Sequence, residues 1–116
     1  MKKKSPHEAV APNIDVVALE REAKRKEAEG NYEDCLKVLE SILQIYKLQR
    51  DSTSPEYEAT CKYACDVSNI LAINHLKQNE FVKALELLKF AEVLSEKNEE
   101  GLAQTYNNFA CYYRRQ

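Results

Sequence analysis

Glycine and proline are scarce in this chain of 116 residues, which contains 2 glycines and 3 prolines. This is about a third of their usual combined share of roughly 12%. So few turn-forming residues exclude a multi-stranded sandwich or barrel and a collagen-like repeat. The glycine loops that cradle phosphate groups are also missing, because neither G-x-G-x-x-G nor G-x-x-x-x-G-K-[ST] occurs. Apolar residues at 44% beside charged residues at 31% predict amphipathic helices and an all-α fold.

The sequence also lacks a strong charge of one sign and a long apolar run. Its 17 basic and 19 acidic residues give a net charge of −2, so no basic field predicts binding to nucleic acid. Uncharged runs such as residues 67–76 are too short to span a membrane. No apolar stretch follows the three lysines at positions 2–4, so we expect neither membrane insertion nor a secretory signal.

Four cysteines lie in segments with helical patterns: Cys35, Cys61, Cys65 and Cys111. Cys61 and Cys65 would share one helix face, as two zinc ligands can. The remaining ligands are poor, because His75 lies ten residues further on and His7 lies near the N-terminus. We interpret the cysteines as buried reduced thiols, typical of a cytoplasmic protein, and expect no metal and no cofactor.

Apolar periodicity and helix-capping residues predict five helices after an N-terminal arm. Residues 1–12 hold two of the three prolines and are expected to form a disordered basic arm. Helices are predicted over residues 14–29, 32–49, 55–77, 81–96 and 99–116. Asn13 and Ser54 are the expected N-caps, Pro55 suits a first turn, and Gly30 suits a helix end. The short turns predict antiparallel neighbours within one helical domain, residues 13–116.

An eight-residue frame with a small residue at its fifth position recurs at intervals of 49 and 38 residues. Its three copies are Leu19-x-x-Glu22-Ala23-x-x-Lys26, Ser68-x-x-Leu71-Ala72-x-x-His75 and Tyr106-x-x-Phe109-Ala110-x-x-Tyr113. A second pattern follows the first two copies in the next predicted helix: Cys35-x-x-x-Leu39-x-x-Ile42 and Ala84-x-x-x-Leu88-x-x-Ala91. We expect the small residues to lie where two helices cross closely, because a bulky side chain there would hold the helices apart.

These patterns resemble the tetratricopeptide repeat, a helix–turn–helix of 34 residues. Two segments are also similar to the longer repeats of kinesin light chains: Ser54-Pro55-Glu56-Tyr57-Glu58-Ala59-Thr60 and Thr105-Tyr106-Asn107-Asn108-Phe109-Ala110. The resemblance covers residues 16–116, about two and a half repeats. It implies an α-solenoid of antiparallel helix pairs that forms the N-terminal part of a longer array.

No group of residues predicts catalysis. His75 is the only histidine outside the arm, it occupies a core position of the frame, and no serine or acid is placed to orient it. We therefore expect a structural histidine and no enzyme activity. The resemblance implies instead a scaffold or adaptor for proteins in a cytoplasmic, cytoskeletal or ciliary assembly.

In such a solenoid the first helix of each pair lines a concave groove. Asparagine amides suit a peptide backbone because they both donate and accept hydrogen bonds, and exposed aliphatic side chains beside them suit binding. We expect the groove to hold a peptide or a partner helix through ten residues: Asn69, Ile73, Leu76, Lys77, Gln104, Asn107, Asn108, Cys111, Arg114 and Arg115. The resemblance disfavours a clamp for chaperone tails, because Glu20, Lys24 and Ile70 replace clamp residues.

The family pattern places a further helix after the last frame, so Tyr106, Phe109 and Tyr113 would lack the surface they pack against. Burying one such ring stabilises by about 1.5–3 kcal/mol. We expect either that the chain continues in a longer protein, which is the simpler reading, or that another chain supplies the helix. The alternative function is therefore a structural element that self-associates through these three aromatic residues.

Overall fold

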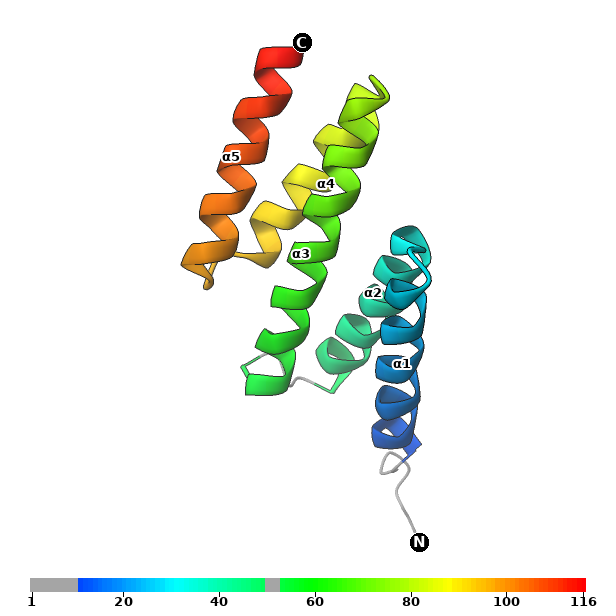
Figure 1. Cartoon of the computed structure of the whole chain (residues 1–116). Helices are drawn as coiled ribbons and strands as arrows, with labels where there is room; N and C mark the ends of the chain where they lie inside the picture. The colour runs from blue at the N-terminus through cyan, green and yellow to red at the C-terminus, as the bar shows by residue number, and fades with distance from the viewer. Residues whose placement is uncertain (1–10, 50–52) are drawn as a thin grey trace, which may run out of the picture. The chain divides into compact units, whose positions relative to one another are not determined.

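A computed structural model describes residues 11–49 and 53–116, and every regular element within these ranges is an α-helix (Figure 1). The helices are α1 (Ala11–Ala28), α2 (Tyr32–Leu48), α3 (Pro55–Lys77), α4 (Phe81–Leu94) and α5 (Glu99–Arg115). The all-α prediction is confirmed. The chain divides after residue 52 into two compact units, whereas the prediction had one domain over residues 13–116.

The predicted starts of α2 to α5 coincide with the structure, and the first helix differs. Ala11 and Pro12 already belong to α1, and Asn13 lies inside the helix instead of capping it. Proline is tolerated there because the first turn of a helix has no N–H partner to lose. The rest of the predicted arm, residues 1–10, lies outside the described residues. The helix α4 ends two residues before its predicted end. At this point the Ser95 hydroxyl donates to the Ala91 carbonyl at 2.8 Å.

The first unit is a hairpin of α1 and α2 closed by a left-handed turn. Gly30 has a φ of +76°, which a residue without Cβ adopts readily. Its N–H donates to the Glu27 carbonyl, and the Asn31 N–H donates to the Lys26 carbonyl, each at 2.9 Å. This pair of bonds is a Schellman motif and satisfies the last carbonyls of α1. The Asn31 side chain then caps α2 by accepting from the Asp34 N–H at 3.2 Å.

The core of the first unit is supplied mainly by one face of α2. Val16 and Ala23 of α1 are buried against it. The buried residues of α2 recur at helical spacing: Cys35, Leu36, Leu39, Ile42, Leu43 and Tyr46. The amphipathic pattern of α2 therefore determines how the hairpin packs.

The α3–α4 hairpin of the second unit closes with the same turn. Asn79 has a φ of +61°, a left-handed conformation that asparagine tolerates better than most residues. Its N–H donates to the Leu76 carbonyl at 3.0 Å, and the Glu80 N–H donates to the His75 carbonyl at 2.9 Å. These are the two bonds of the Gly30 turn, repeated 49 residues later. The interval equals that between the first two copies of the eight-residue frame.

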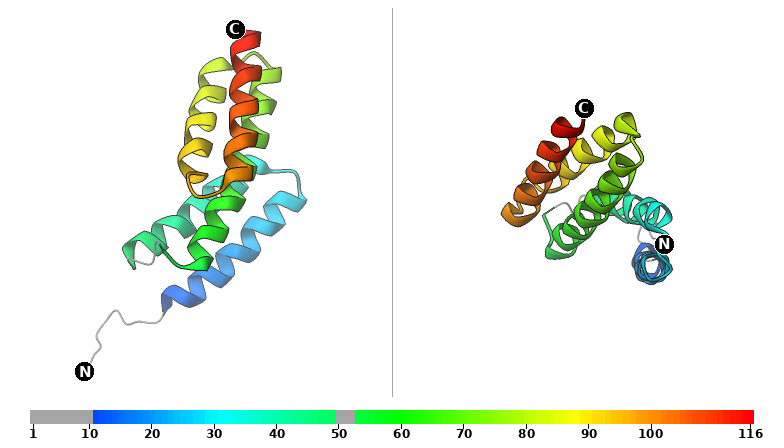
Figure 2. Two further views of the ribbon diagram at one scale, coloured as in Figure 1. Left: turned by 90° about the vertical axis from the view of Figure 1, so that its left-hand side faces the viewer. Right: turned by 45° about the horizontal axis from the view of Figure 1, so that its top comes forward.

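The second unit is completed by α5, which packs against both α3 and α4, as the two views in Figure 2 show. Ser54 caps α3 by accepting from the Tyr57 N–H at 3.0 Å, and Asn98 caps α5 by accepting from the Gly101 N–H at 3.2 Å. The buried apolar cluster of this unit contains Ala72, Leu76, Ala84, Leu88 and Tyr112. All three helices therefore contribute to one core.

Candidate interaction surface

The inner face of α5 holds the helix in the second unit. Gly101, Thr105, Asn108 and Tyr112 are buried and recur at intervals of four, three and four residues, as one helix face requires. Tyr112 reaches the core, where its ring meets that of Phe81 edge-on with centroids 6.2 Å apart. This face orients the rest of α5.

A buried hydrogen-bond network fixes the register of α5 on α3. The Asn108 amide donates to Asn69 Oδ1 at 2.8 Å, and the Asn69 amide donates to Thr105 Oγ1 at 3.0 Å and to the Cys65 carbonyl at 3.1 Å. Thr105 Oγ1 in turn donates to the Gly101 carbonyl at 2.7 Å. A buried network with its groups paired specifies one arrangement, since any other would leave amides without partners.

The Cys65 thiol lies beside this network, 3.8 Å from Thr105 Oγ1. Burial raises the pKa of Cys65, so the neutral thiol is favoured there. Cys35 is also buried, whereas Cys61 and Cys111 are only half-buried, so the prediction of burial is wrong for these two. None of the four forms a disulfide.

This packing corrects the predicted groove. Leu76, Asn69 and Asn108 were expected to be exposed, but they are 2%, 5% and 6% exposed. The reason is that α3 and α5 contact each other through the face assigned to the groove, so its central residues pair across the two helices. Ile73 and Cys111 are half-buried against the apolar cluster.

The remaining predicted residues lie on the surface of the second unit: Lys77, Gln104, Asn107, Arg114 and Arg115. Arg115 donates to Asn79 Oδ1 at 3.4 Å, next to the α3–α4 turn. Gln104 donates to Asn108 Oδ1 at 3.4 Å, at the edge of the buried network. The exposed part of the predicted site is therefore polar and basic.

A different side of α5 carries the largest exposed apolar side chains of this helix. We define the aromatic face as Tyr106, Phe109, Ala110 and Tyr113. Tyr106 is 50% exposed and Tyr113 is 63% exposed, while Phe109 is half-buried between them. The ring of Phe109 lies 6.4 Å from that of Tyr106 and 6.3 Å from that of Tyr113, at tilted and stacked angles. The rings thus form a continuous row along the helix.

Two further contacts hold this row in place. The Tyr106 hydroxyl donates to Glu92 Oε2 of α4 at 3.1 Å. That hydrogen bond, together with the carboxylate charge, raises the pKa of Tyr106 and keeps the hydroxyl protonated. At the other end of the row, the Tyr113 ring meets the buried Tyr112 ring edge-on at 5.1 Å.

The exposure of Tyr106 and Tyr113 agrees with the sequence analysis, but that of Ala110 does not. Phe109 was also expected to lack a packing surface, but it packs against the buried apolar cluster. Ala23 and Ala72 are buried where helices meet, as predicted for the small residue of the frame. Ala110 is exposed, so its predicted place at a helix crossing is wrong for the described residues.

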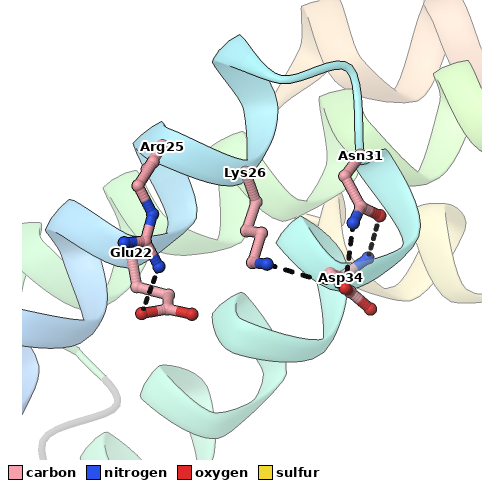
Figure 3. Close-up of polar contacts among 5 residues, drawn as sticks. All are labelled: Glu22, Arg25, Lys26, Asn31 and Asp34. Carbon is pink, nitrogen blue, oxygen red and sulfur yellow. Dashed lines mark hydrogen bonds and ion pairs between the residues drawn. The ribbon is translucent and has the colours of Figure 1, made fainter.

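The titratable groups of both units make structural contacts. His75 Nδ1 lies within hydrogen-bond distance of Glu80 Oε1, across the α3–α4 turn, so the expectation that no acid is placed to orient His75 is wrong. The hydrogen bond with His75 lowers the pKa of Glu80. In the first unit, Lys26 Nζ reaches Asp34 Oδ2 at 3.9 Å beside the capping Asn31, as Figure 3 shows. No set of three or more His, Cys, Asp or Glu side chains in residues 11–49 and 53–116 is placed to hold a metal ion.

None of the helices in the described part of the chain combines the length and apolar character that crossing a membrane requires. Comparisons with protein-family models, curated protein sequences and solved structures return no match. The geometry of α5 is therefore the ground for assigning a function.

Proposed function

We propose that this chain is a protein-interaction module of the tetratricopeptide type, which acts as a scaffold or adaptor in the cytoplasm. Its docking surface is the aromatic face of α5, and its occupant is a helical segment of a partner protein. The observation that carries the proposal is the row of three contacting rings, of which Tyr106 and Tyr113 are half or more exposed.

Such a row suits binding for physical reasons. Aromatic side chains provide a large apolar area with few rotatable bonds, so ordering them on binding costs little entropy. The Phe109 and Tyr106 rings are already held by neighbours, which lowers this cost further. Ala110 leaves room beside the rings for the backbone of a second helix to approach.

A basic side chain borders the aromatic face on α5. Arg114 is exposed next to it and can contact polar groups of a partner. It belongs to the part of the predicted groove that stays accessible, and in this proposal it lies at the rim. Rim residues influence association rates and selectivity more than affinity.

Site-specific photocrosslinking tests the proposal. A photoreactive phenylalanine analogue replaces Tyr113 in one version of the full chain and Asn107 in the other, both in cells. We expect a discrete heterologous adduct only from position 113, and its loss when Ala110→Glu is added. Equal adducts from both positions, or none from position 113, would contradict a docking role for the aromatic face.

A second candidate function is self-association through the same face. It is favoured by one observation: Tyr106, Phe109, Ala110 and Tyr113 carry no charge, so two copies can meet without like-charge repulsion. The crosslinking experiment separates the two functions. An adduct of two 13.4 kDa chains from position 113 identifies the dimer.

A further inference from the structure

The two hairpins of this protein, α1–α2 and α3–α4, are built alike. They show how the following helix packs against the helix that carries the eight-residue frame. In each hairpin the helix that carries the frame ends at a left-handed residue, Gly30 or Asn79, with the same pair of backbone hydrogen bonds. The following helix then runs back along the first. The covering helix therefore meets the frame in antiparallel orientation.

Small residues are buried in both helices of each hairpin. The fifth residue of the frame is almost fully buried, with Ala23 at 0% and Ala72 at 1% exposure. Twelve residues later, in each covering helix, comes another small buried residue, with a buried leucine four positions beyond it: Cys35 with Leu39, and Ala84 with Leu88. The frame is thus covered by a small-x-x-x-Leu pattern, which lets two helices approach closely.

The eighth residue of the frame makes a polar contact in both hairpins. Lys26 forms an ion pair with Asp34 in the first turn of α2, and His75 contacts Glu80 directly before α4. In each case the acid lies at the N-terminal end of the covering helix. A carboxylate is also favourable there because of the helix dipole.

The third copy of the frame is on α5, and its residues form the aromatic face. Its fifth residue, Ala110, is exposed, whereas Ala72 at the same frame position is 1% exposed. Its eighth residue, Tyr113, is 63% exposed and has a hydroxyl that can donate.

We infer that the aromatic face binds an antiparallel amphipathic partner helix with three features. A small residue lies against Ala110, a leucine follows it by four positions, and an acidic residue near the N-terminus of the helix accepts from the Tyr113 hydroxyl. This inference rests on the proposed function and gives its partner a defined chemistry.

A second copy of α5 fits this surface less well. The pattern of a small residue followed by leucine after four positions does not occur between Glu99 and Arg115. Two α5 helices would instead place tyrosine rings of one copy against those of the other. A partner helix of the kind found in α2 and α4 therefore matches the frame better than self-pairing does.

The chain itself provides the probe, because α4 carries Ala84, Leu88 and the preceding Glu80. A fluorescent peptide of residues 79–97 is titrated with the full chain, and its anisotropy is measured. We expect saturable binding that weakens by about tenfold or more with Ala110→Glu in the protein or Leu88→Asp in the peptide. The matched control Asn107→Glu, on the polar side of α5, leaves binding unchanged. If the peptide bound the Ala110→Glu variant as tightly as the original protein, it would be displacing α4 from the second unit. That result would overturn the inference.

A short peptide is only marginally helical in water. A second experiment therefore attaches the same segment covalently to the chain. Residues 79–97 are copied directly after Gln116, which places the copied Ala84 twelve residues after Ala110, the spacing of both hairpins. Because linkage raises the effective concentration, we expect the thermal midpoint to rise by about 5 °C or more. Leu88→Asp in the copied segment abolishes the rise.

The outcomes separate this inference from the function on which it rests. If the peptide does not bind and the linked helix does not stabilise the chain, the partner has a different chemistry. The proposed function still holds in that case if Tyr113 crosslinks to another protein in cells. If the crosslink fails while the α4 peptide binds, the surface accepts such a helix but does not use it as a docking site.

Discussion

The buried amide pair between α3 and α5 gives the sharpest test of the second unit. Asn108→Ala removes the donor that lies 2.8 Å from Asn69 Oδ1, and Asn69 is only 5% exposed. Leaving a buried acceptor without its partner costs about 1–3 kcal/mol. Alanine is the better helix former by about 0.6 kcal/mol, which offsets part of this loss. We expect a net destabilisation of about 1.5 kcal/mol.

The neighbouring residue provides a matched control. Asn107 is exposed, so Asn107→Ala gains the helix propensity without a buried loss and should stabilise by about 0.5 kcal/mol. Free energies of unfolding come from urea titrations followed by far-UV circular dichroism on the full chain. The two adjacent substitutions should therefore differ by about 2 kcal/mol, with opposite signs. Equal effects, or a more stable Asn108→Ala variant, would refute the network as a source of stability.

Three further predictions concern packing, capping and pH. Ala72→Leu should cost about 1–3 kcal/mol by overpacking the core, whereas Ala110→Leu at the same frame position should stay within about 0.5 kcal/mol, both by urea titration. Gly101→Ala should not give the usual gain of about 1 kcal/mol, because its Cβ would lie 3.2 Å from the Cys65 sulfur and 2.5 Å from the capping amide; a thermal melt showing that gain would contradict the close packing. The hydrogen bond with His75 lowers the pKa of the Glu80 carboxyl below 4.5. The stabilisation that this hydrogen bond gives to the folded state is therefore present above pH 4.5, and it is lost as the pH falls through the pKa of Glu80 in the folded state. Glu80→Gln should make the melting temperature depend less on pH in this acidic range.

Local signals explain why the helices could be predicted. Ser54 before Pro55 begins α3, and Asn98 begins α5, because each side chain caps an N–H three residues on. Gly30 ends α1, because its left-handed backbone conformation cannot continue the helix. Each signal acts within one turn, so the neighbouring sequence is enough to locate it. The start of α1 was mispredicted because Pro12 is compatible both with an irregular arm and with a first helical turn.

The candidate site could be predicted only in part, because its burial depends on neighbours distant in sequence. Asn69 and Asn107 are equally polar, and a helical pattern alone places both on a solvated face. Only the contact between α3 and α5 shows that Asn69 pairs with Asn108, 39 residues away, while Asn107 stays exposed. By contrast, Tyr106 and Tyr113 are exposed, as the sequence analysis expected.

Phe109 of the aromatic face packs against the buried apolar cluster, whereas Ala110 and Tyr113 are exposed, and this difference makes the proposals testable. Tyr112 and Asn108 hold the helix in the core, at 4% and 6% exposure. Tyr113 and Ala110 contribute little to that core, because both remain exposed. Substitutions of Ala110 or Tyr113 should therefore change binding while the helical content and the unfolding free energy are kept. If Ala110→Glu instead unfolded the second unit, the aromatic face would be part of its core, and it would not be available to a partner.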